Sequence, residues 1–263
     1  MNERTSDTHN ELELRRLLGI AAIVGLIALW FVLTPEVIPE LVLPSPESIW
    51  ETIITLRFEL VRHASYTLAR VMAGWGAGVT MGIAFGLLMS WSRTVFAISN
   101  PIIETVRPLP PIALIPLFII WFGIGAFSQI LLIGLGSFMV LVVNTYVSVS
   151  NLSPRYIRAA SSLGASKLRV YRTVILPAII PDLVSGFRIA SALAFGVGVA
   201  AEFIGAQAGV GYMIMVARRT LNTETILLGT IVIGLESYTI DRCIRYVSQY
   251  MCRWMNKPIE DLS

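Results

Sequence analysis

The segment RAASSLGASKLRVYRTVILPAIIP, residues 158–181, is polar and lies within a chain that is otherwise strongly apolar. Just before it, Ser153 is a residue type favoured at a helix N-cap, and Pro154 suits the first helical turn. Gly164 suits the left-handed position that ends many helices. These signals predict a short helix over residues 154–163, set in a polar loop that runs from Ser150 to Asp182.

The predicted helix has two faces of different chemistry. One is a narrow face of small and apolar groups, made by Tyr156, Ala159, Ala160 and Leu163, and the opposite face carries Arg155, Arg158 and Ser162. Ser166 is placed to cap a second helix to about Leu176, where Pro177 and Pro181 are expected to break the path back toward the membrane. A solvated basic loop would explain the charges alone, whereas a docking surface explains the charges, the two capped helices and the Ala-Ala pair.

Composition excludes an ordinary water-soluble enzyme. Of the 263 residues, 55% are hydrophobic and 14% are charged, and the mean hydropathy is +0.72. Soluble domains carry about 25% charged residues. The net charge of +3 is too small to suggest nucleic-acid binding. The N-terminus has no small-residue cleavage site after its first apolar run, so we do not expect a cleaved signal peptide.

Several apolar stretches are long enough to cross a bilayer, which takes about 20 helical residues. The predicted spans are residues 17–33, 68–89, 112–124, 130–149, 183–204 and 226–240, which makes an all-α membrane protein of six transmembrane helices. Of the Lys and Arg residues outside these spans, 14 lie on the side of the N-terminus and four on the other side. Because Lys and Arg are enriched in cytoplasmic loops, both termini are expected in the cytoplasm.

Some features within the spans indicate how they pack. Glycines at 74, 76, 78, 82 and 86 suit close helix packing in the second span, and the prolines at 108, 110, 111 and 116 interrupt the third. An amphipathic outer-surface helix is expected to lead into the second span. His63, on that helix, is expected to be solvated or interfacial.

The polar loop resembles the EAA loop of permease subunits of binding-protein-dependent ABC importers. The resemblance rests on Arg158–Gly164, followed after nine residues by Val174–Pro177, with Arg158 at the position where the family has Glu. Residues 104–125 and 200–214 resemble the taurine, alkanesulfonate and nitrate branch in particular.

The resemblance implies a type I importer permease in a bacterial inner membrane, with a cytoplasmic tail (1–16), a first helix and periplasmic segment (17–60), a core (61–245, including the 150–182 coupling loop) and a C-terminal tail (246–263). It implies a homodimer, two ATPase subunits and a periplasmic or lipid-anchored solute-binding protein. The residues implied to dock on the ATPase are Arg155, Tyr156, Arg158, Ala159, Ala160, Leu163, Gly164 and Ala165. The implied cargo is taurine or another sulfonate, with nitrate or bicarbonate as the alternative.

The chain carries no Gly-x-x-x-x-Gly-Lys-Ser/Thr phosphate loop. It is therefore expected to be no enzyme and to hold no cofactor, with ATP and Mg on the partner ATPase. An ion-coupled secondary transporter is the alternative from another class, and it predicts inverted repeats and an ion site at mid-depth. Neither feature is evident in the sequence.

Charged and glycine-rich positions supply candidates for the translocation path or gate. They are Arg188, Glu202, Gly205, Gly209, Gly211 and Met213. Charges at membrane depth are costly and invite a functional hypothesis. Glu202 either lines the path or bonds to loop amides, and Arg188 is expected to reach the inner interface. Arg218 and Arg219 are expected outside, where they either lie at the interface or attract anions and the binding protein.

Overall fold

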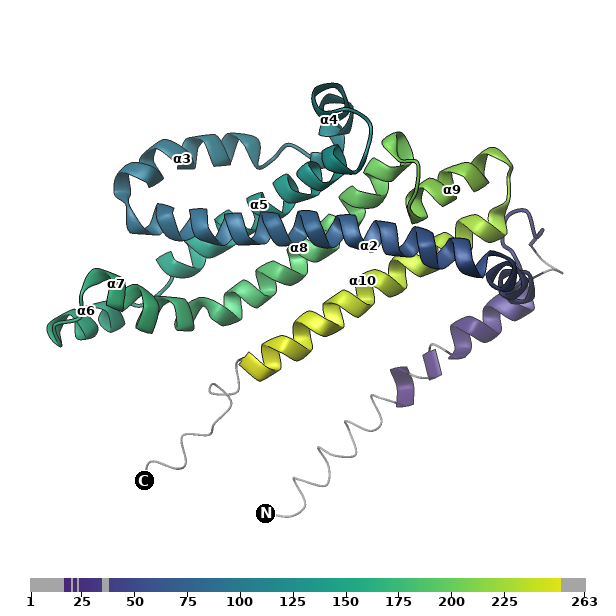
Figure 1. Cartoon of the computed structure of the whole chain (residues 1–263). Helices are drawn as coiled ribbons and strands as arrows, with labels where there is room; N and C mark the ends of the chain where they lie inside the picture. Colours follow the sequence, from purple (N-terminus) through teal and green to yellow (C-terminus); the bar gives the residue numbers. More distant parts are fainter. Residues whose placement is uncertain (1–16, 20, 23, 35–37, 252–263) are drawn as a thin grey trace, which may run out of the picture.

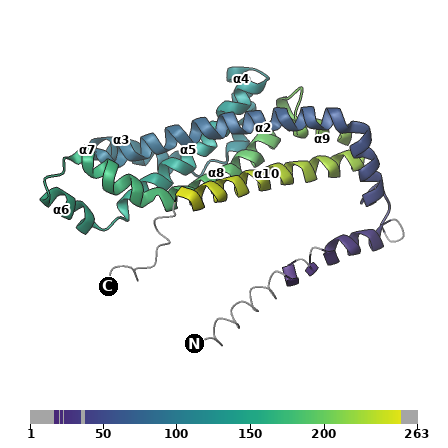
Figure 2. The same ribbon diagram turned by 60° about the horizontal axis from the view of Figure 1, so that its bottom comes forward.

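The described residues fold into an elongated bundle of helices. The computed structural model describes residues 17–19, 21–22, 24–34 and 38–251. Four long helices, α2 (Pro46–Trp91), α5 (Ala126–Ser150), α8 (Leu176–Gly205) and α10 (Thr223–Met251), run along the bundle (Figures 1 and 2). The described part of the chain is helical throughout apart from its turns and connections, which confirms the all-α prediction.

Helix α2 is one continuous helix of 46 residues that merges the predicted outer-surface helix with the second span. Ser45 caps it, its hydroxyl accepting a hydrogen bond from the Ser48 backbone N–H at 3.2 Å. At 1.5 Å per residue the helix is about 69 Å long, more than twice the thickness of a bilayer core. Part of α2 therefore extends beyond the apolar layer.

Glycines on one face of α2 let α5 approach closely. A Cβ at Gly74, Gly82 or Gly86 would lie 2.7 Å from the nearest atom of α5, and one at Gly78 would collide with the Gly134 carbonyl. The predicted packing role is confirmed for these four glycines. It is wrong for Gly76, which has open space around it because it lies off that face.

The third span is built differently from the prediction of residues 112–124. Helix α3 (Arg93–Val106) runs back along α2, and the chain then bends by 86° into the 3-10 turn η1 (Pro111–Leu114) and α4 (Ile115–Phe122) (Figure 1). Pro108, Pro110 and Pro111 lie at the bend, where they cannot donate helical hydrogen bonds. Arg107, counted with the inner loop in the sequence analysis, therefore lies at the bend itself.

The predicted break at Pro177 and Pro181 is wrong. Helix α7 (Lys167–Val170) continues through the π-helical turn η2 (Tyr171–Ile175) into α8, which contains both prolines. In the π turn, the Leu176 N–H donates to the Tyr171 carbonyl, five residues back. The wider π turn accommodates the absence of a backbone N–H at Pro177, so the chain continues as a helix.

Three helices in the described residues are long and apolar enough to cross a membrane, or four when the bent α3–α4 pair is taken as one span. The three are α2, α5 and the run from Lys167 to Gly205. Helix α10 contains the predicted span 226–240 but is not among them. The predicted first span, residues 17–33, includes positions outside the described residues.

The core lies where α2, α5 and α8 meet. One buried cluster joins Val71, Leu132, Ile133 and Phe195 near the middle of the bundle, and a second joins Leu141, Ile175 and Ile179 toward the end that carries the polar loop. This second cluster ties the loop to the long helices.

Candidate functional site

The polar loop forms the helix that the sequence predicts. Helix α6 spans Pro154–Ser162, with Ser153 as its N-cap and Leu163 as its C-cap. The Ser153 hydroxyl accepts a hydrogen bond from the Arg155 N–H at 3.4 Å, and Gly164 has a φ of 79°. The helix lies with α7 at one extreme end of the bundle, away from α4 and α9 (Val210–Arg219) (Figures 1 and 2).

Helix α6 leaves an apolar surface uncovered. Leu163 is 88% exposed and Tyr156 is 65% exposed, and Ala159 and Gly164 are exposed with them. Arg155 and Arg158 are also exposed and form no ion pair within the described part of the chain. Surface leucines of this exposure suit contact with another protein more than contact with water.

The opposite side of α6 is anchored to the bundle. Ile157, Ala160 and Ala165 pack against the buried cluster of Ile175, Ile179 and Leu183. Ala160 and Ala165, predicted to dock on a partner, are therefore half-buried within the chain itself. Ile157 was missed in the sequence, although it lies one residue after Tyr156 and three before Ala160, the spacing of a second helix face.

Lys167 and Tyr171 join the loop to the end of α2. The Lys167 ammonium donates to the Trp91 carbonyl at 2.8 Å and lies 4.4 Å from the Trp91 ring centre. The Tyr171 ring centre is 4.7 Å from that of Trp91. These polar and aromatic contacts join α7 and the π turn η2 to α2, and α6 in turn packs against α7 and η2.

Three of the predicted path residues, Glu202, Gly209 and Gly211, meet at the other end of the bundle, around the Glu202 carboxylate. Glu202 is 2% exposed. Its oxygens accept hydrogen bonds from the Thr67 hydroxyl at 2.9 Å, the Arg70 guanidinium at 3.0 Å and the Gly211 N–H at 2.9 Å. These donors come from α2 and α9, so the carboxylate joins three helices.

Gly209 and Gly211 are required by this carboxylate. Gly209 has a φ of 124°, and a Cβ there would collide with the Glu202 carboxylate. A Cβ at Gly211 would lie 2.8 Å from the Glu202 Cβ. The glycine-rich turn thus brings backbone N–H groups onto the carboxylate, one of the two alternatives that the sequence left open for Glu202.

His63 takes part in the same cluster and is partly buried, so the solvated alternative is wrong and the interfacial alternative stays a prediction. Its side chain is 12% exposed, and its Nδ1 accepts a hydrogen bond from the Gly209 N–H at 3.0 Å. The Val210 N–H donates to Thr67 at 2.8 Å, and Arg70 also donates to the Ala208 carbonyl at 2.6 Å. Helix α2 therefore holds the turn before α9 through three side chains.

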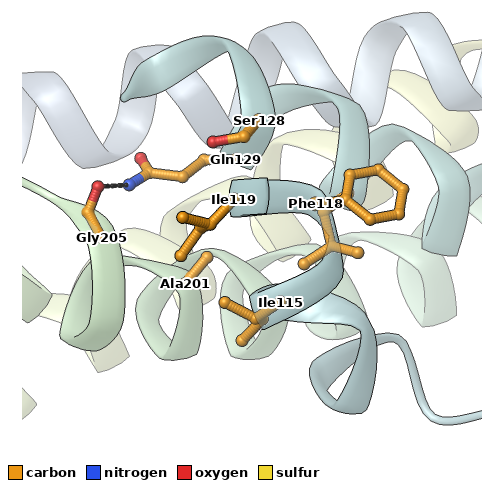
Figure 3. Close-up of a pocket in the computed structure, with 8 residues that line it drawn as sticks. Ile115, Phe118, Ile119, Ser128, Gln129, Ala201 and Gly205 are labelled. Atoms are coloured by element: carbon orange, nitrogen blue, oxygen red, sulfur yellow. Dashed lines mark hydrogen bonds between the residues drawn. The ribbon is translucent and has the colours of Figure 1, made fainter. Parts of the chain in front are cut away.

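Gly205 ends α8 beside a very small cavity, shown in Figure 3. Its carbonyl accepts a hydrogen bond from Gln129 Nε2 at 3.0 Å. The cavity of about 10 Å³ has room for about one water molecule. The Gln129 Oε1 atom is buried and lacks a protein partner among the described residues. Met213, 8% exposed, completes the buried part of α9.

Arg188 is separate from this group. It lies 14 residues before Glu202 on α8, about 21 Å along the helix. Its Nε donates to Asp241 on α10 at 2.6 Å, and the other Asp241 oxygen accepts from Arg245 at 2.8 Å. Thr67, Arg70 and Asp241 were not predicted from the sequence, because each has its partner on another helix, distant in sequence.

Comparison with known proteins gives three findings. A family model described as the binding-protein-dependent transport system inner membrane component matches residues 78–251. The taurine transport system permease protein TauC of Escherichia coli (strain K12) is 36% identical over 245 residues, which cover 90% of this chain and 89% of that protein. An aliphatic sulfonates transport permease protein, SsuC of Bacillus subtilis (strain 168), is 32% identical over 241 residues. The aligned residues cover 90% of this chain and 87% of that protein.

The fold also matches a solved structure. A chain of the MetNI methionine ABC transporter in an inward-facing conformation superposes with a TM-score of 0.61. The match covers 73% of this chain and 98% of that chain, at 22% sequence identity.

Proposed function

The chain belongs to the family of binding-protein-dependent transport system inner membrane components and is a permease subunit of an ABC importer, and we propose that it carries taurine or another small sulfonate. The observation that carries the proposed cargo is the 36% identity to a taurine permease over 90% of the chain. The similarity to an aliphatic sulfonate permease supports the same class of cargo.

We propose that α6 is the helix on which an ATPase subunit docks. Tyr156, Ala159 and Leu163 offer an exposed apolar surface, and Arg155 and Arg158 surround it with positive charge. Ile157 and Ala160 pack against the base of α8. A displacement of α6 by the ATPase would therefore reach α8 through α7 and the π turn η2, and Lys167 of α7 would carry it to α2.

The proposed topology has six spans with both termini in the cytoplasm of a bacterial cell, and α6 on the cytoplasmic side. With Arg107 at the bend of the broken span, 13 Lys and Arg residues outside the spans lie on the proposed inner side and four on the outer side. The imbalance still favours this orientation. The core remains assigned to residues 61–245, between the 17–60 segment and the tails.

The proposed complex contains two copies of this chain, two ATPase subunits that bind ATP and Mg, and a solute-binding protein on the outer side. Arg218 and Arg219 end α9 at the end of the bundle opposite α6 and offer positive charge to the binding protein or the anion. We assign the Glu202 cluster to bracing this outer mouth, because its carboxylate already has three donors.

Reconstitution in proteoliposomes tests the proposal. The chain, its ATPase and its binding protein are expected to take up labelled taurine only when ATP is supplied on the α6 side. Unlabelled sulfonates should compete with the uptake, and nitrate and bicarbonate should not. Uptake by the chain alone, driven by an ion gradient, would contradict the ABC mechanism, whereas competition by nitrate alone would contradict only the cargo.

A further inference from the structure

A cavity of about 570 Å³ lies at the bend between α3 and α4. It is separate from the Glu202 cluster and from α6. The residues of the bend form one side and the facing surfaces of α5 and α8 form the other. Its lining includes Arg107, Pro110, Leu135, Met139, Asn144 and Leu193.

Arg107 brings a positive charge to this cavity. It directly follows the 14-residue helix α3, about 21 Å along the helix axis from Arg93. No carboxylate lies within ion-pair distance of its side chain among the residues that the structure describes. Arg107 is exposed at the bend of the broken span, and a guanidinium without an ion pair in an apolar layer is costly, which favours a functional role.

Asn144 supplies a second hydrogen-bond donor. Its Oδ1 atom is buried without a protein partner, and a Cβ at Gly186 would lie 2.6 Å from it. Its Nδ2 atom makes no hydrogen bond within the described residues and is not among their buried unpartnered atoms, so the amide N–H₂ is free to donate to a bound molecule. The lining therefore contains two groups of N–H donors and no carboxylate.

The rest of the lining is mainly apolar. Leu135, Met139, Val140 and Leu193 contribute hydrocarbon surface across from the bend. A guanidinium binds two oxygens of an anion such as sulfonate in parallel, with planar geometry. A charged group at one end and apolar walls around it match a molecule with an anionic head and a short aliphatic part.

We propose that this cavity is a binding station for the sulfonate within the translocation path, with Arg107 holding the anionic head and Asn144 donating a further hydrogen bond. The inference rests on the proposed function. Since liquid water takes about 30 Å³ per molecule, the anion would be bound there together with several waters.

Uptake and ATP hydrolysis measured on the same reconstituted complex test the proposal. In Arg107→Gln we expect sulfonate uptake to fall about tenfold or more, because a hydrogen-bonded charge is lost. Stimulation of ATP hydrolysis by the binding protein should stay within about twofold of the original level, since docking does not involve Arg107. Arg107→Lys should retain part of the uptake. Arg93→Gln, an exposed arginine on the same helix, is the matched control and should transport normally.

Unchanged uptake in Arg107→Gln, or an equal loss in Arg93→Gln, would overturn the proposal. If the Arg107→Gln complex does not assemble, as shown by lost ATPase stimulation, the nearly isosteric variant Asn144→Asp tests the cavity instead. Its carboxylate should repel the anion and reduce uptake. Normal uptake in Asn144→Asp would overturn the proposed binding site. If the unaltered complex carries nitrate and no sulfonate, the proposed cargo fails, and the same variants assayed with nitrate decide the cavity separately.

Discussion

At the scale of single residues, the buried carboxylate of Glu202 organises the outer end of the molecule. Three donors from α2 and α9 converge on this carboxylate. Gly209 and Gly211 leave room for Glu202, because a Cβ at either position would collide with its side chain. The sequence indicated that Glu202 and the glycines belong together, since they lie within ten residues. It did not indicate Arg70, because a partner 132 residues away is recognisable only once α2 and α8 are packed together.

Replacing this carboxylate should strongly destabilise the protein. Glu202→Gln leaves Arg70 without its ion pair in a buried site, and breaking such a pair costs about 3 kcal/mol or more. We expect a clear drop in the thermal unfolding midpoint in detergent. Glu51→Gln, on an exposed residue of α2, should change stability by less than about 0.5 kcal/mol. Equal midpoints for the two variants would show that the cluster does not brace the fold.

At the scale of secondary-structure elements, the pair of α2 and α5 depends on the glycine face. Gly82→Ala places a Cβ 2.7 Å from the Leu141 Cβ and 2.9 Å from the Phe138 carbonyl. Because both helices would have to separate, we expect a loss of about 1–3 kcal/mol. Unfolding of the purified protein in detergent measures it.

Gly76→Ala is the control for this prediction. It adds the same methyl group to the same helix where nothing lies within 4 Å. Alanine is the better helix former, so this variant should be neutral or slightly more stable, by up to about 1 kcal/mol. A similar loss in both variants would contradict the account, because only Gly82 lies in close contact with α5.

The ion pair between α8 and α10 should contribute little by itself. Arg188 is 38% exposed and Asp241 is 27% exposed, and exposed pairs contribute at most about 1 kcal/mol. Asp241→Asn is therefore expected to shift the unfolding midpoint only slightly and to retain uptake. A loss of uptake with unchanged stability would instead assign Arg188 to the path.

Elements with strong local signals were the ones that the sequence predicted well. Ser153, Pro154 and Gly164 define α6 to within one residue because capping depends on neighbouring atoms. The interruption at Pro108, Pro110 and Pro111 was predicted, whereas the course of the chain at the bend after α3 and the π turn before Pro177 were not. Both arise from how the chain accommodates prolines while it packs against α5 and α8. Such packing depends on residues that are distant in sequence, so local signals do not predict it.

At the scale of the whole molecule, the two ends have different roles joined by α8. One end presents α6, whose inner residues Ile157 and Ala160 pack near the start of α8. The other end holds the last turn of α8 against α2 and α9 through Glu202. Composition and the loop motif were sufficient to predict the family and the class of function. The cavity at Arg107 required the three-dimensional arrangement of α3, α5 and α8.

The most direct test of the account is copurification of the ATPase subunit with the full chain carrying Leu163→Asp. Leu163 is the C-cap of α6 and is 88% exposed, so we expect the change to leave the fold intact and to place a charge on the proposed docking surface. Leu41→Asp, on a leucine that is 61% exposed before α2, is the matched control. We predict that the Leu41 variant retains the ATPase and the Leu163 variant loses it. Retention of the ATPase by the Leu163 variant at the original level would contradict the account.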